Sequence, residues 1–185
     1  MMYTRDIIQK RYNEGENFRY IFFWGHHPSK NGIITKSCLS QWYDCKFTVD
    51  GTQYSTAEQY MMSQKAVLFG DIEVNEEIMK AGHPGEYKAL GRKIRSFDPA
   101  IWDKSKTDIV IKGNTAKFSQ NPELKKFLLS TGDRVLVEAS PYDRIWGIGM
   151  NAQTGNPENP FNWNGENLLG FCLMEVRNIL NRPLA

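Results

Sequence analysis

The stretch STAEQYMMSQKAVLF, residues 55–69, decides most of what the sequence predicts about the fold. Its first four residues match a capping box, in which a Ser or Thr and a Glu three residues later satisfy the backbone at a helix start. We therefore expect an amphipathic helix over the whole stretch. On a wheel of about 100° per residue, Glu58 and Lys65 lie two turns apart within its apolar stripe. Gln59 and Ser63 form the more plausible solvent face.

Charged side chains rarely lie among apolar neighbours unless they are paired or face a cavity, so these two have alternative interpretations. In the structural one, Glu58 completes the capping box and Lys65 extends along the apolar surface to water. In the functional one, the helix dipole holds Glu58 as a carboxylate that acts as a base or stabilises positive charge. Desolvation would lower the pKa of Lys65, whose amine could then act as an acid or a nucleophile.

Outward from this stretch, the pattern predicts a helix-rich chain with a small β component. Further helices are expected over residues 71–82, 84–91, 106–118, 121–132 and 166–181. Short strands are expected over 20–24, 46–49, 52–54 and 134–138, the middle two joined by the Asp50-Gly51 turn of a hairpin. Residues 140–165 form a long loop, and a loop of this length in a compact domain is usually functional or disordered.

The composition fits one globular domain, since 185 residues at roughly 150 per domain give about one. With 41% hydrophobic and 24% charged residues the chain is not disordered, and a net charge of +2 gives no sign of a non-specific DNA binder. The longest aromatic-aliphatic run, residues 20–24, is far shorter than the roughly 20 residues that cross a bilayer. No secretory signal is visible, and three cysteines without metal-type spacing indicate a cytoplasmic protein with reduced thiols.

A second candidate region follows the strand predicted at residues 134–138. Asp143 and Trp146 are three residues apart, so within one helical turn they face the same space. A carboxylate beside an indole suits a ring-containing ligand; the alternative is that Trp146 is core and Asp143 caps a turn. Residues 147–152 formally fit G-x-G-x-x-A, but residues 153–157 cannot open the helix that a dinucleotide motif requires.

Several other residues have both a functional and a structural interpretation. Trp24, Trp42 and Trp102 could stack on a ring or belong to the core. Arg92 and Lys117 could bind phosphate, although solvated surface is the default interpretation of a lysine.

Nine segments in this order resemble the NADAR family, also called the YbiA-like N-glycosidases. They are FFWGH (22–26), LSQWY (39–43), FTVDGTQY (47–54), EQYMMSQKA (58–66), KALGR (88–92), KF (117–118), TG (131–132), EASPYDRIWGIG (138–149) and NLLG (167–170). Many members carry Ser-Asn-Phe-Tyr where this chain has SQWY at 40–43. The resemblance covers about residues 20–180, so we expect an N-terminal extension over 1–19 and the domain over 20–185. It implies a compact, helix-rich α+β single domain.

The resemblance also implies hydrolysis of an N-glycosidic bond at ribose C1, with no metal and no cofactor. Family substrates are phosphorylated ribosylamino-pyrimidines of early riboflavin synthesis and ADP-ribose attached to guanine; a non-catalytic ADP-ribose-binding module is a further alternative. The expected partner is therefore a small phosphoribosyl or ADP-ribosyl molecule, with nucleic acid only as modified substrate and no membrane. The expected catalytic residues are Glu58, Lys65 and Asp143. The expected substrate-binding residues are Trp146, Trp42, Tyr43, Trp24, Arg92 and Lys117.

Overall fold

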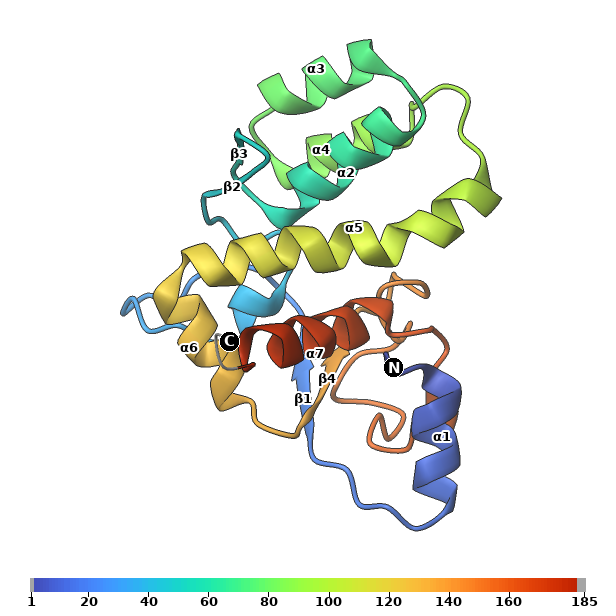
Figure 1. Ribbon diagram of the computed structural model, residues 1–185. Coiled ribbons are helices and arrows are strands. Elements are labelled where there is room, and N and C mark those ends of the chain that lie inside the picture. Colours follow the sequence, from blue (N-terminus) through green and yellow to red (C-terminus); the bar gives the residue numbers. More distant parts are fainter. Residues whose placement is uncertain (1, 183–185) are drawn as a thin grey trace. The chain divides into compact units, whose positions relative to one another are not determined.

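The computed structural model describes residues 2–182, and from β1 onward its helices and strands follow the predicted order (Figure 1). The helices and strands are α1 Arg5–Asn13, β1 Tyr20–Phe23, β2 Phe47–Val49, β3 Thr52–Tyr54, α2 Ala57–Leu68, α3 Ile72–Lys80, α4 Pro84–Gly91, α5 Pro99–Gln120, α6 Pro122–Ser130, β4 Val135–Glu138 and α7 Leu168–Leu180, with 3-10 turns at Lys36–Leu39 and Pro160–Asn162. Helix α1 was not predicted, and α5 begins seven residues before the helix expected over 106–118. The predicted helix-rich α+β class is confirmed. Residues 183–185 of the predicted domain lie outside the described residues.

The contacts divide the chain into two compact units, each of which is described by itself. The central unit is Gln41–Pro122, and the terminal unit combines the described residues up to Ser40 with those from Glu123 onward. The predicted division at residues 19 and 20 stays a prediction. None of the helices within residues 2–182 combines the length and the apolarity that crossing a bilayer requires.

The terminal unit is built on a pair of parallel strands. β1 pairs with β4 from Tyr20 opposite Val135 to Phe23 opposite Glu138, and α7 packs against β4. Asn167, just before α7, binds β4 through its side chain: its Nδ2 donates to the Leu136 carbonyl at 2.9 Å, and its Oδ1 accepts from the Glu138 N–H at 2.9 Å. The carboxyl end of β4, where the candidate loop begins, is therefore fixed by α7.

The N-terminal part of the terminal unit differs from the sequence prediction in two places. No helix was predicted within residues 1–19, yet α1 lies there and buries Ile8 completely. In the same helix Gln9 donates to the Pro160 carbonyl at 3.0 Å, and Arg5 pairs with Glu166 at 3.2 Å. The strand predicted over residues 20–24 ends at Phe23, and Trp24, which follows it, is 56% exposed.

In the central unit, α2 is enclosed by α3, α4 and α5, and the β2–β3 hairpin leads into its first turn (Figure 1). The predicted hairpin turn is confirmed, since Asp50 and Gly51 have φ values of 49° and 80°. The predicted solvent face of α2 is wrong: Gln59 and Ser63 are only 4% and 2% exposed. Both face α3, where Gln59 donates to the Ile78 carbonyl at 3.2 Å.

Candidate functional site

The start of α2 lies one residue later than the predicted capping box. Thr56 Oγ1 accepts from the N–H of Gln59 at 3.1 Å, and Gln59 Oε1 accepts from the N–H of Ser55 at 2.8 Å. These reciprocal bonds form the capping box, so Gln59 fills the position expected for Glu58. The Glu58 side chain has no part in this box, although it is only 4% exposed. Its structural interpretation as the capping carboxylate is therefore wrong.

The Lys65 amine lies against protein groups of the central unit. Its Nζ donates to the Gly91 carbonyl at 2.9 Å and lies 4.3 Å from the centroid of the Phe97 ring and 5.6 Å from that of Trp102. Burial removes water from the half-buried ammonium and lowers the pKa of Lys65. The expected direction of the shift is therefore confirmed, and a larger fraction of the amine is neutral at a given pH.

Lys117 of α5 is fully buried, so its interpretation as a solvated surface lysine is wrong. Its Nζ lies 5.8 Å from the ring centroid of Tyr43 and 5.1 Å from that of Phe118. Tyr43 is only 7% exposed. Because a desolvated ammonium near aromatic rings interacts with their electron-rich faces, this lysine helps to fix the ring of Tyr43.

The other two predicted residues of the central unit, Trp42 and Arg92, lie at opposite ends of α4. Trp42 is half-buried and meets the ring of His83, the N-cap residue of α4, edge-on at 6.3 Å between centroids. Arg92 is exposed and caps the C-terminus of the same helix. It directly follows Gly91, whose carbonyl accepts the hydrogen bond of Lys65. Arg92 therefore places an exposed guanidinium next in sequence to the group that holds the Lys65 amine.

The terminal unit carries the remaining predicted residues, Trp24, Asp143 and Trp146. The helical turn expected at Asp143 is wrong, because residues 144–147 form a bend. Asp143 Oδ1 accepts from the N–H groups of Ile145 and Trp146 at 2.9 and 2.8 Å, which is the turn-capping alternative. Trp146 is half-buried, and Trp24 lies 6.1 Å from Tyr142 between ring centroids. One oxygen of Asp143 thus orients the loop that carries Trp146.

Sequence reasoning missed the interaction of Gln41 with Asn114 in the central unit. Asn114 Nδ2 donates to Gln41 Oε1 at 2.8 Å and to the Val110 carbonyl at 2.9 Å. The backbone carbonyl of Gln41 in turn accepts from the backbone N–H of Glu58 at 2.9 Å. The sequence did hold a sign that Asn114 belongs to the site, because Asn114 lies three residues before Lys117 and hence on the same face of α5.

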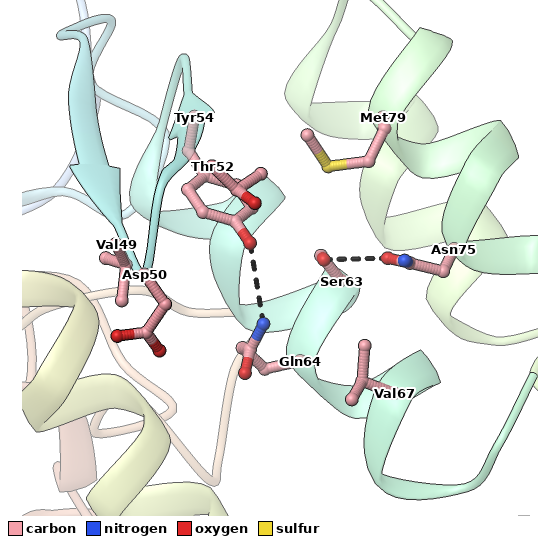
Figure 2. A pocket seen from close by; sticks show the side chains of 9 residues that line it. All are labelled: Val49, Asp50, Thr52, Tyr54, Ser63, Gln64, Val67, Asn75 and Met79. Atoms are coloured by element: carbon pink, nitrogen blue, oxygen red, sulfur yellow. Dashed lines mark hydrogen bonds between the residues drawn. The ribbon is translucent and has the colours of Figure 1, made fainter. Parts of the chain in front are cut away.

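A separate cavity of about 190 Å³ lies in the central unit between the β2–β3 hairpin and helices α2 and α3, and it contains none of the predicted site residues (Figure 2). Figure 2 shows that four of its polar groups bind one another in pairs: Ser63 lies 2.7 Å from Asn75 Oδ1, and Gln64 Nε2 donates to the Tyr54 hydroxyl. Within residues 2–182, no three His, Cys, Asp or Glu residues gather as metal ligands.

Comparison with known proteins assigns the family. The model of the NADAR domain matches residues 22–181. The chain belongs to the NADAR family. A relative, N-glycosidase R617 of Acanthamoeba polyphaga mimivirus, is 47% identical over 169 residues, which are 88% of this chain and 96% of that protein. This NADAR protein is therefore an N-glycosidase, a hydrolase of N-glycosyl bonds.

Two further similarities extend the family assignment. The NMR structure of Escherichia coli YbiA matches this NADAR chain with a TM-score of 0.67 and 30% identity, over 89% of this chain and 86% of that one. Riboflavin biosynthesis protein VVA0006 of Vibrio vulnificus is 31% identical over 142 residues, 77% of this chain and 35% of that protein. The fold thus agrees with that of a solved member of the family.

Proposed function

We propose that this N-glycosidase hydrolyses the bond between nitrogen and ribose C1 in phosphorylated ribosylamino-pyrimidines, intermediates of early riboflavin synthesis. The observation that carries the proposal is helix α2. It presents the buried carboxylate of Glu58 and, two turns later on the same face, the Lys65 amine with its lowered pKa. The name of the Vibrio vulnificus relative supports this substrate class.

The bond between C1 and nitrogen breaks as positive charge develops at C1 and the ring oxygen. A carboxylate beside C1 stabilises this charge and takes a proton from water, whose oxygen then bonds to C1. Glu58 is assigned this role because it lies on the same face of α2 as Lys65, whereas one carboxylate oxygen of Asp143 accepts two backbone N–H groups of its own loop. Asp143 then acts by orienting the segment that carries Trp146.

Lys65 has two roles that its surroundings support. As an ammonium it gives a proton to the leaving nitrogen or to the ring oxygen. As a neutral amine it attacks C1 of the opened sugar, forms an imine with C1 and displaces the base nitrogen, which leaves with a proton; water then releases the sugar. The lowered pKa favours the second role, because it raises the neutral fraction of the amine.

The aromatic and cationic residues of the central unit have different proposed roles in holding the substrate. Trp42 is half-buried and keeps ring surface for stacking on the leaving base, and Trp146 of the terminal unit stays a predicted substrate-binding residue. Arg92 is exposed and suits the phosphate, whereas buried Lys117 supports Tyr43. Trp24 of the terminal unit, whose ring is exposed, also stays a predicted substrate-binding residue. The partner is a small phosphoribosyl molecule, and the cytoplasm is the proposed location, consistent with three cysteines that form no disulfide.

The alternative substrate is ADP-ribose attached to guanine in nucleic acid, where Trp42 would stack on the guanine ring. The test offers the purified protein a ribosylamino-pyrimidine 5′-phosphate and an ADP-ribosylated guanine oligonucleotide, with mass spectrometry of the products. We expect release of ribose 5-phosphate from the first at a higher kcat/KM. Release of ADP-ribose from the second alone would contradict the proposed substrate and assign the alternative one.

A further inference from the structure

The orientation of the two buried amides, Gln41 and Asn114, is fixed by the backbone. The Val110 carbonyl can only accept a hydrogen bond, so the atom of Asn114 that faces it at 2.9 Å must be Nδ2. The same Nδ2 lies 2.8 Å from the Gln41 amide, which must therefore present its oxygen. Gln41 Nε2 and Asn114 Oδ1 consequently point away from this hydrogen bond.

Gln41 Nε2 and Asn114 Oδ1 have no hydrogen-bond partner among the described residues, and both are shielded from solvent. Gln41 is 6% exposed and Asn114 is fully buried. A buried polar group without a partner is costly, and native proteins satisfy nearly all of them with protein, water or ligand. Amide dimensions limit the separation of this donor and this acceptor to about 7 Å. Together they form a paired donor and acceptor that no described group satisfies.

The paired amides lie among residues already assigned to the site. The carbonyl of Gln41 accepts from the N–H of Glu58, the proposed carboxylate. Trp42 and Tyr43 follow Gln41 directly in the chain, and Lys117 follows Asn114 by one helical turn. All of these residues belong to the central unit. The two unpartnered atoms therefore belong to residues that are hydrogen-bonded to the backbone of Glu58 or lie near Trp42 and Lys117 in the chain.

We propose that Gln41 and Asn114 recognise the lactam edge of the leaving base. A lactam presents a C=O beside an N–H, so Gln41 Nε2 donates to the first and Asn114 Oδ1 accepts from the second. Pyrimidinones and guanine both carry such an edge, whereas a base with an amino group beside an unprotonated ring nitrogen presents the opposite pattern. This inference rests on the proposed function, because it assigns the base specificity of that same site.

The test measures binding of two small probes by calorimetry, without any hydrolysis. Isocytosine carries a lactam edge, and in 2,4-diaminopyrimidine an amino group and a ring nitrogen replace it. We expect wild-type protein to bind isocytosine about ten- to a hundredfold more tightly. Gln41→Met should abolish this preference, and Gln41→Glu, which exchanges the donor for an acceptor, should shift it towards the diamino probe. Gln64→Met, a glutamine of the separate cavity, should leave it unchanged.

The outcomes separate this inference from the proposed function. An unchanged isocytosine preference in folded Gln41→Met and Gln41→Glu proteins would overturn it and leave the amides with a structural role, satisfied by buried water. Equal binding of both probes by wild-type protein would also overturn it. A preference for isocytosine that depends on Gln41, in a protein that hydrolyses neither nucleotide substrate, would support the subsite and contradict the proposed substrates. If Gln41→Met does not fold, the shift in Gln41→Glu decides.

Discussion

Replacement of Lys65 separates its contribution to stability from its contribution to catalysis. Lys65→Met removes one charged hydrogen bond to the Gly91 carbonyl and the cation–π contact with Phe97 at 4.3 Å. Such interactions are worth about 1.5–3 and about 0.5–2 kcal/mol. Removal of the half-buried charge relieves desolvation and offsets part of this loss, so we expect a net loss of about 1–2 kcal/mol. At about 2–4 °C per kcal/mol, Tm should fall by roughly 2–8 °C.

The effect on catalysis should be much larger than this modest loss of stability. A positioned acid or base contributes about 10²–10⁴-fold, and a lost nucleophile costs more. We therefore expect kcat/KM of Lys65→Met to fall at least about a hundredfold. Lys65→Arg keeps the charge and the stacking on Phe97. It should retain part of the activity if Lys65 acts through its charge, and none if the amine forms an imine.

The assay is product release from the ribosylamino-pyrimidine phosphate, together with thermal unfolding and borohydride trapping during turnover. In the imine route the wild-type rate should rise with pH through the pKa of Lys65, which lies below its ordinary 10.5. Trapped sugar should be found on Lys65. A folded Lys65→Met protein that keeps kcat/KM within about threefold of wild type would refute the assignment of Lys65 to the site.

Three further predictions concern the central unit. Asp71 caps α3 and binds Arg95, and the guanidinium of Arg95 holds the pKa of the Asp71 carboxyl well below its ordinary 3.8. The ionised carboxyl therefore stabilises the fold above pH 3.8, and this stabilisation is lost as pH falls towards the lowered pKa. The Tm difference between wild type and Asp71→Asn should therefore shrink in acid, and a constant difference would contradict this. Gly113→Val should lose about 1–3 kcal/mol in urea unfolding, since a Cβ there lies 2.3 Å from Cδ1 of Tyr60. Thr56→Ala should lose about 1 kcal/mol of unfolding free energy, and an unchanged urea midpoint would refute its capping role.

Helix and strand positions could be predicted from the sequence because their signals are local. Asp50-Gly51 requires the backbone of a hairpin turn, and Asp71 is a helix cap whose side chain accepts from the N–H of Val74. The start of α2 could not be settled in this way, because Ser55 and Thr56 are both good caps. Ser55 is not the cap, because its backbone still belongs to the hairpin side of the junction: its carbonyl accepts from the N–H of Cys45 at 3.0 Å.

The burial of candidate residues depended on contacts distant in the chain. Gln59 and Ser63 lie one turn apart on the polar side of the helical wheel, where a solvent face is expected, yet α3 supplies a carbonyl and an amide that satisfy them. Lys117 resembles a surface lysine in sequence, and its burial follows from the packing of α5 against the segment that carries Tyr43. The amides of Gln41 and Asn114 are 73 residues apart, so no local pattern pairs them.

The most direct test of the central claim, that the buried carboxylate of α2 breaks the N-glycosidic bond, is single-turnover hydrolysis by Glu58→Gln. The matched control is Glu77→Gln on the exposed surface of α3. We expect wild type and Glu77→Gln to release ribose 5-phosphate at the same rate. Folded Glu58→Gln should bind the substrate and release product at least about a hundredfold more slowly. Equal rates in all three proteins would contradict the account.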